Sequence, residues 1–132
     1  MAHSIETYKG KTTVINDLDL LVIMGFAIEI IHQSASFAGF RDLETHWRRS
    51  IRQYGPGVLD LKLEQFITTP DKTRELRALL STIVERASQH GKTVSAQVLN
   101  ELISAPDVVF GDLNISYIEE AIKKLQALVA EN

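Results

Sequence analysis

Apolar residues recur at helical spacing along most of the chain, and residues 69–91 show the pattern most clearly. Thr69 followed by Pro70 is typical of a helix N-cap and first helical position, and Gly91 is typical of the left-handed residue that ends a helix. Between them, one face of a helix collects the apolar side chains Leu76, Leu79, Leu80, Ile83, Val84 and Ala87. We therefore predict a long amphipathic helix in this stretch.

The stretch NDLDLLVIMGFAIEIIHQS is apolar around nearly the whole circumference of a helix. Asn16 or Asp17 suits its N-cap, and Glu29 interrupts the apolar run. The run is short for a bilayer span, so we expect a buried central helix and no membrane anchor. Gly25 within it costs about 1 kcal/mol relative to alanine, which predicts that another element crosses closely there.

Residues 41–54 also read as a helix, which the Gly-Pro-Gly sequence at 55–57 ends. Its apolar positions form a single inward stripe: Leu43, Trp47, Ile51 and Tyr54.

Two more helices complete the pattern. The first begins after Thr93 or Ser95, and its inward residues are Val98, Leu99, Leu102 and Ile103. In the last helix Ser116 and Glu119 have the spacing of a capping box. Its core-facing residues are Ile118, Ile122, Leu125, Leu128 and Val129.

Strand-like alternation is limited to short segments. The segment HSIETYKGKTTVIND predicts two short strands joined at a turn that contains Lys9 and Gly10. Residues 58–63 alternate as in a strand, but residues 63–67 suit a helix, so we expect an extended piece that passes into a helical turn. The fold class is therefore mainly α: one domain over residues 1–132, built as a bundle of about five helices with an accessory N-terminal β-hairpin.

Composition and charge narrow the class of protein. The chain is 45% hydrophobic and 23% charged, and it has no cysteine, which excludes disulfides, thiolate catalysis and cysteine-based zinc sites. The first residues show no apolar signal segment, and we expect a cytoplasmic protein. Residues 94–132 carry two lysines against six carboxylates. This acidic third favours a basic protein partner over nucleic acid.

The stretch LETHWRRSIRQYGPG holds Arg48, Arg49 and Arg52 outside the apolar stripe of its helix. Glu44 and Arg48 have the i, i+4 spacing of a favourable ion pair. We interpret this surface mainly as a solvated charged face, with contact to a partner or to phosphates as alternatives. A helix-turn-helix in residues 83–102 is not favoured, because several template positions that should be apolar are polar. A nucleic-acid-binding regulator that uses the three arginines is therefore a second alternative function.

Glu29 and His32 have the Glu-x-x-His spacing of di-iron carboxylate bundles, but the sequence has no second such motif. We expect Glu29, His32 and Gln33 to form a polar strip satisfied by hydrogen bonds or by an arginine, with no metal and no cofactor. The sequence also lacks a nucleophile elbow, a Walker loop and a zinc-protease motif. The first alternative function is a small-molecule-binding protein or enzyme with a pocket beside Glu29 and His32.

From residue 61 to residue 129 the order of segments, with LEQFI…TP leading into a long helix, resembles small bacterial proteins, some of which are assigned as immunity partners of toxins. The resemblance implies a single-domain, non-enzymatic, cytoplasmic protein that occludes a protein partner. It carries over no functional residue. The leading function is therefore a small protein-binding protein, in its most concrete form an immunity-type inhibitor, and a homo-oligomer is left open.

The loop APDVVFGDL places apolar residues between Asp107 and Asp112, which suits a patch that contacts a basic protein with Phe110 as its anchor. The competing interpretation is that Val108–Phe110 folds inward as a short strand. The predicted partner-binding residues are Asp107, Phe110, Asp112, Glu101, Arg48 and Arg52.

Overall fold

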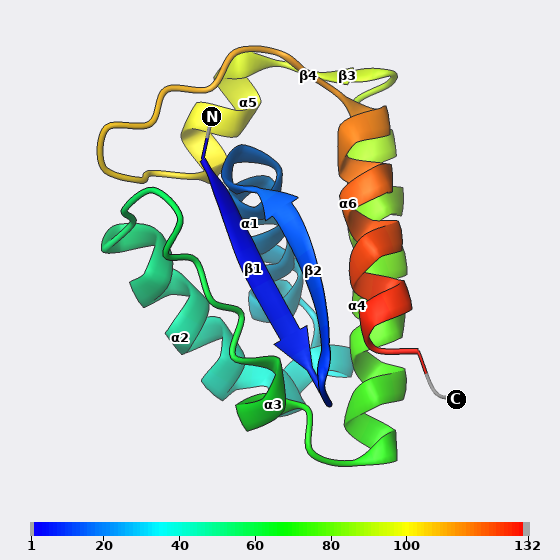
Figure 1. Cartoon of the computed structure of the whole chain (residues 1–132). Helices are drawn as coiled ribbons and strands as arrows, with labels where there is room; N and C mark the ends of the chain where they lie inside the picture. The colour runs from blue at the N-terminus through cyan, green and yellow to red at the C-terminus, as the bar shows by residue number, and fades with distance from the viewer. Residues whose placement is uncertain (1, 131–132) are drawn as a thin grey trace.

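A computed structural model describes residues 2–130. In chain order the elements are β1 (His3–Tyr8), β2 (Lys11–Asn16), α1 (Asp17–Gln33), the 3₁₀ helix η1 (Ala35–Phe40), α2 (Arg41–Arg52), α3 (Leu63–Phe66), α4 (Pro70–Ser88), β3 (Thr93–Val94), α5 (Ala96–Leu102), β4 (Leu113–Asn114) and α6 (Ile115–Leu128). The β1–β2 hairpin lies in front of α1, with α2 on one side of it and the α4–α6 pair on the other (Figure 1). The predicted mainly α fold with an N-terminal hairpin is confirmed.

Helix α1 is the centre of the molecule and packs against α2, α4, α5, α6 and the hairpin. Every residue from Leu20 to Ile28 is buried, as the apolar circumference predicted. Asn16 is the N-cap, and its side chain accepts a hydrogen bond from the Leu18 N–H. Gly25 is where α5 approaches: a Cβ at this position would lie 2.5 Å from Ile103 Cγ1. The predicted close crossing is therefore confirmed.

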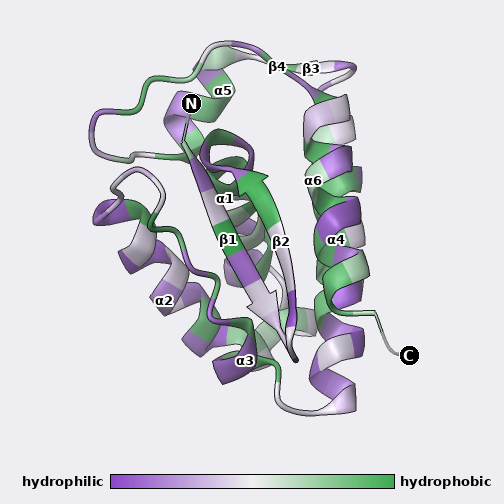
Figure 2. Ribbon diagram, in the orientation of Figure 1, coloured by the Kyte–Doolittle hydropathy of each residue, from purple (hydrophilic) through white to green (hydrophobic). Residues whose placement is uncertain are grey.

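The outer helices bury most of the stripes that the sequence predicted, while Tyr54, beyond the end of α2, and Val84 are half-buried. In Figure 2 the ribbons of α2, α4 and α6 carry hydrophobic and hydrophilic residues on different faces. In α2, Trp47 is 1% exposed and its indole N–H donates to the Leu61 carbonyl at 3.0 Å. Thr69 caps α4 by accepting from the Lys72 N–H. Gly91, with φ of 95°, follows the end of α4, as expected for a left-handed stop.

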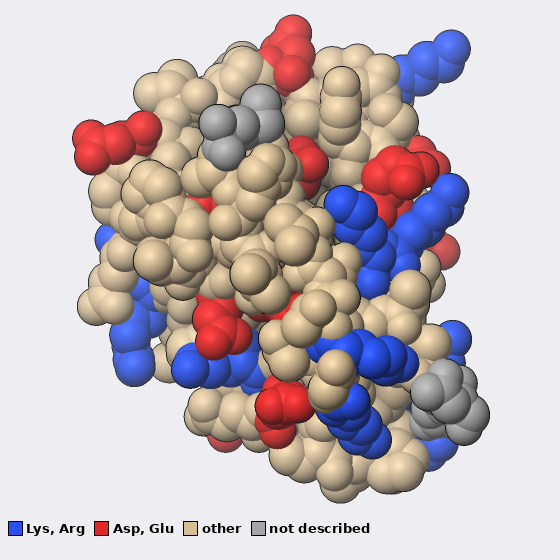
Figure 3. Space-filling view, viewed as in Figure 1, with Lys and Arg blue, Asp and Glu red and all other residues tan. Residues whose placement is uncertain are grey.

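The hairpin pairs Ile5 with Val14 and turns at Lys9 and Gly10, both of which have positive φ. Ile5 and Val14 point outward and are exposed by 63% and 48%. Uncharged residues fill most of the centre of this face, and charged side chains lie mainly around it (Figure 3). The inner face of β1 is unusual, because two of its three inward side chains, Ser4 and Glu6, are polar.

These inward side chains hold the extended segment at residues 57–62 beside β1. The Leu59 N–H donates to Ser4 Oγ and the Leu61 N–H donates to Glu6 Oε1. Because side chains of β1 occupy these donors, no backbone ladder forms between the two segments. The predicted extended piece is confirmed, without strand pairing, and it passes into α3 as expected.

The start of α6 differs from the prediction. The predicted capping box of Ser116 and Glu119 is wrong, because the N-cap is Asn114, whose side chain accepts from the Ser116 N–H at 2.9 Å. β4 pairs with β3 up to Asn114, so the helix begins at the next residue. In α5, Ser95 is the N-cap of the two candidates.

Within residues 2–130, no single helix is long and apolar enough to cross a membrane. Only α1 together with residues 35–52, bent by 120° from it, would pass as a pair on length and composition.

Candidate functional site

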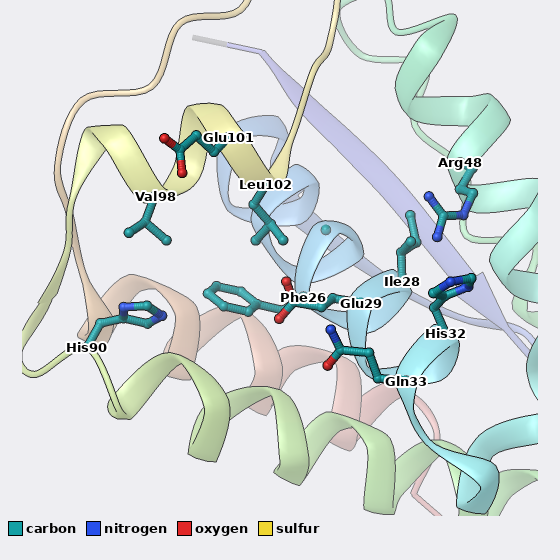
Figure 4. A pocket seen from close by; sticks show the side chains of 11 residues that line it. Phe26, Ile28, Glu29, His32, Gln33, Arg48, His90, Val98, Glu101 and Leu102 are labelled. Carbon is teal, nitrogen blue, oxygen red and sulfur yellow. The ribbon is translucent and has the colours of Figure 1, made fainter.

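Two adjoining cavities open onto the surface between α1, α2 and α5, and we refer to them together as the α1–α2–α5 groove. Their volumes are about 450 Å³ and about 230 Å³. Both are lined by Gly25, Ile28, Arg48 and Leu102, so the two cavities form one continuous depression. The floor is largely apolar, and the larger cavity adds Phe26 and Val98 to it (Figure 4).

The C-terminal half of α1 contributes the polar strip of Glu29, His32 and Gln33 to this groove. Arg86, from α4, donates to Glu29 Oε1 at 2.8 Å and to Gln33 Oε1 at 3.4 Å. The sequence predicted that hydrogen bonds or an arginine would satisfy this strip, and this is confirmed for Glu29 and Gln33. A side chain from α4 thus fixes one wall of the groove.

The carboxylate of Glu44, on α2, contacts two side chains that line the groove. Glu44 is buried, with its side chain 9% exposed. Arg48 Nε donates to Glu44 Oε2 at 2.8 Å, and His32 Nδ1 lies 3.5 Å from the same oxygen. Arg41 Nη1 lies 3.8 Å from the other carboxylate oxygen. The predicted Glu44–Arg48 pair is therefore present, as part of a larger cluster that joins α1 to α2.

The two walls of the groove differ in charge. Arg48 and His32 lie next to each other on the α2 side, whereas Glu101 on α5 stands at the opposite edge (Figure 4). Arg52, one helical turn beyond Arg48, lines the smaller cavity. Among the described residues 2–130, Glu101 accepts a single hydrogen bond, a long one of 3.4 Å from the side-chain amide of Gln97. The groove therefore has a cationic wall, an apolar floor and an acidic edge.

The strongly perturbed ionisable groups lie elsewhere. Burial raises the pKa of Glu6 to about 7, with the hydrogen bond from Leu61 opposing the shift and the charges of Asp60 and Asp17 adding to it. Burial and the hydrogen bond that its hydroxyl donates to Asp17 raise the pKa of Tyr54 to about 12. These groups hold residues 54–61 against the hairpin and do not line the groove. Strongly shifted pKa values often mark catalytic sites, but in this protein they belong to groups that join residues 54–61 to the hairpin.

Three of the six predicted partner-binding residues meet at the groove, although they are far apart in the sequence. Arg48 lines both cavities, Glu101 lines the larger one and Arg52 the smaller one. Glu29 and His32, which the sequence proposed for a pocket, line the same larger cavity. The crossing of α5 over α1 brings these separate predictions together.

The other three predicted residues belong to the loop between α5 and α6, where Phe110 as an exposed anchor is wrong. Phe110 is 5% exposed, and the side-chain amide of Asn100 binds its backbone N–H and carbonyl at 2.8 and 2.9 Å. Phe110 therefore turns inward, whereas Val109 is 86% exposed and residues 107–110 form no strand. Asp112 accepts from the Ala96 N–H at 2.7 Å, and Asp107 is exposed.

Sequence reasoning missed two contributors to the site. The ion pair of Glu44 was visible as an i, i+4 spacing, but its burial and its contact with His32 depend on the packing of α1 on α2. Arg86 carried no local signal that it would reach Glu29. Within residues 2–130, no three histidine or carboxylate side chains are grouped as metal ligands.

No family model, curated protein or solved structure matches this chain.

Proposed function

We propose that this protein is a non-enzymatic binding protein that receives a segment of a partner protein in the α1–α2–α5 groove. The observation that carries the proposal is the layout of the groove: an apolar floor between the cationic wall of Arg48 and Arg52 and the acidic edge at Glu101. Such a layout suits a segment whose apolar side chains enter the floor while charged side chains set its direction.

The form of the groove favours a protein segment over an enclosed ligand. Pockets for small molecules commonly bury about 70–90% of the surface of their ligand. The two cavities are instead open to solvent and follow one another along the same helices. Two of the charged side chains that line them, Glu29 and Arg48, are already engaged in ion pairs, which favours a fixed binding surface over proton-transfer chemistry.

The finer form of the proposal is an immunity-type inhibitor that occludes a toxin in the cytoplasm. The resemblance of residues 61–129 to small bacterial proteins supports it, and so does the acidic C-terminal third, of which Glu101 is the member that lines the groove. A partner with basic residues near its contact segment would complement that edge.

The test uses a variant that fills the groove. Glu101 is an exposed residue on α5, so Glu101→Trp places a large side chain at the mouth of the larger cavity without removing a core residue. Glu120→Trp is the matched control, because Glu120 is an exposed glutamate on α6 that lines neither cavity. We expect a protein retained from native lysate by the wild type and by Glu120→Trp to be lost from Glu101→Trp, and the purified pair to show the same difference by calorimetry. Equal binding of the purified partner to both variants would contradict the proposal.

A small-molecule ligand is the second candidate, because the larger cavity, at about 450 Å³, is of the size that such ligands occupy. Native mass spectrometry of the gently purified protein tests it. A bound mass of constant value in the wild type and in Glu120→Trp, absent from Glu101→Trp, would favour this second function.

A further inference from the structure

We propose that the α2 side of the groove is a carboxylate-binding subsite formed by Arg48, Arg52 and His32, with Glu44 as the residue that positions them. This inference rests on the proposed function, since it assigns the subsite to an acidic side chain of the bound partner segment.

Glu44 is the residue that holds the side chains of the subsite in place. Its buried carboxylate contacts Arg48 Nε at 2.8 Å and His32 Nδ1 at 3.5 Å, so one carboxylate orients a side chain from α2 and another from α1. Arg41 Nη1 lies 3.8 Å from the other oxygen of the same carboxylate. Two arginines around a single carboxylate leave unbalanced positive charge at this wall. Side chains held in place before binding lose less conformational entropy when a ligand arrives.

The donors that remain face an incoming ligand. Glu44 uses only Nε of Arg48, which leaves both terminal nitrogens as a planar fork of the kind that binds a carboxylate through two hydrogen bonds. His32 keeps its Nε2 edge beyond the nitrogen that contacts Glu44. Arg52 lines the next part of the groove, and no hydrogen bond or ion pair to another residue in the described range 2–130 engages its guanidinium. Arg48 and His32 lie side by side in Figure 4.

The rest of the groove determines where an acidic side chain would lie. Arg86 already neutralises Glu29, so the polar strip of α1 does not supply a competing negative charge. Glu101 repels a second carboxylate from the α5 edge. A bound segment would therefore place its acidic residue against α2 and its apolar neighbours over Ile28 and Leu102.

The experiment titrates the isotopically labelled protein with sodium acetate, with sodium phosphate and with sodium chloride at equal ionic strength, at one fixed pH, and follows the arginine Nε–H and histidine ring signals by NMR. We expect saturable shifts of Arg48, Arg52 and His32 with acetate, and only small linear shifts with chloride. Arg48→Gln should weaken acetate binding about tenfold or more, as the loss of charge-assisted hydrogen bonds implies. Arg77→Gln is the matched control, because Arg77 is an exposed arginine on α4 that lines neither cavity.

The Glu44→Gln variant distinguishes a positioning role of Glu44 from a purely electrostatic effect of its charge on acetate binding. Removal of a negative charge beside the subsite would by itself strengthen acetate binding, whereas loss of the group that orients Arg48 and His32 weakens it; we expect weaker binding. Tighter binding in Glu44→Gln would overturn the positioning role. Acetate shifts no larger than those of chloride would overturn the subsite, and saturation by phosphate well below the acetate range would overturn its assignment to a carboxylate.

The outcome is independent of the test of the proposed function. If acetate does not bind but Glu101→Trp abolishes partner retention, the subsite fails and the groove remains the partner site. If acetate binds but the partner is retained by Glu101→Trp, the subsite stands and the proposed function fails.

Discussion

The backbone N–H of Leu61 donates a 2.8 Å hydrogen bond to Glu6 Oε1, a buried carboxylate 55 residues earlier in the chain. The second oxygen of Glu6 is buried and has no hydrogen-bond partner in the part of the chain that the structure describes. Burial raises the pKa of Glu6 to about 7, from an ordinary value of 4.5. The native state therefore binds this proton more tightly than the unfolded chain does. Its contribution to stability is fully present below pH 4.5 and is lost as the pH rises through about 7.

We predict that Glu6→Gln removes this part of the pH dependence, because glutamine keeps an acceptor for the Leu61 N–H and cannot ionise. Urea unfolding between pH 4.5 and pH 8 should show the wild type losing stability as the pH rises and Glu6→Gln losing less. Glu64→Gln is the matched control, since Glu64 is an exposed glutamate that accepts one backbone hydrogen bond, from Lys9. Identical slopes for the wild type and Glu6→Gln would contradict the assignment.

Trp47 joins α2 to the segment at residues 57–62, so its truncation should be among the most damaging core changes. We expect Trp47→Ala to lower the free energy of unfolding by about 3–5 kcal/mol, as large aromatic truncations do. Trp47→Phe keeps most of the packing but leaves the Leu61 carbonyl without its donor, which we expect to cost about 1–3 kcal/mol. Chemical denaturation measures both. A loss below about 1 kcal/mol in Trp47→Ala would be incompatible with a core role.

Gly25→Ala tests the close approach of α5 to α1. Alanine is the better helix former by about 1 kcal/mol, but its Cβ would lie 2.5 Å from Ile103 Cγ1, and we expect the overpacking to dominate. In an Ile103→Ala background the same change should become neutral or stabilising, because the obstructing side chain is gone. Gly111→Ala is the control, since nothing lies within 4 Å of a Cβ there. Thermal unfolding of the wild type, Gly25→Ala, Ile103→Ala and the double variant forms a double-mutant cycle, and additive effects would contradict the contact.

Asn100 should govern the order of the loop between α5 and α6. Its amide donates to the Phe110 carbonyl and accepts from the Phe110 N–H. Asn100→Ala leaves both groups without a partner, and we expect a loss of about 1–3 kcal/mol with faster hydrogen exchange at Phe110. Asn100→Asp keeps the acceptor and loses the donor, so its Phe110 amide should remain better protected than in Asn100→Ala. Unchanged exchange in Asn100→Ala would show that the burial of Phe110 alone holds the loop.

The sequence by itself determined the helices and most of their ends. The periodicity of α4 and α2, and the caps at Asn16 and Thr69, arise from groups within about four residues of each other, so local patterns carry that information. It also predicted that another element crosses α1 at Gly25, because a glycine inside a helix has a cost that close packing explains.

Only the tertiary structure decided where α6 begins, which way Phe110 points and which helices line the same cavity. Pairing of β3 with β4 moved the cap of α6 to Asn114, and the Asn100 clasp turned Phe110 inward, where the local sequence left both directions open. Arg48 and Glu101 lie on helices separated by more than forty residues, and they line the same cavity because α2 and α5 both pack beside α1. A pattern within one helix specifies which face is buried, but which other helix faces the remaining surface depends on packing over the whole chain.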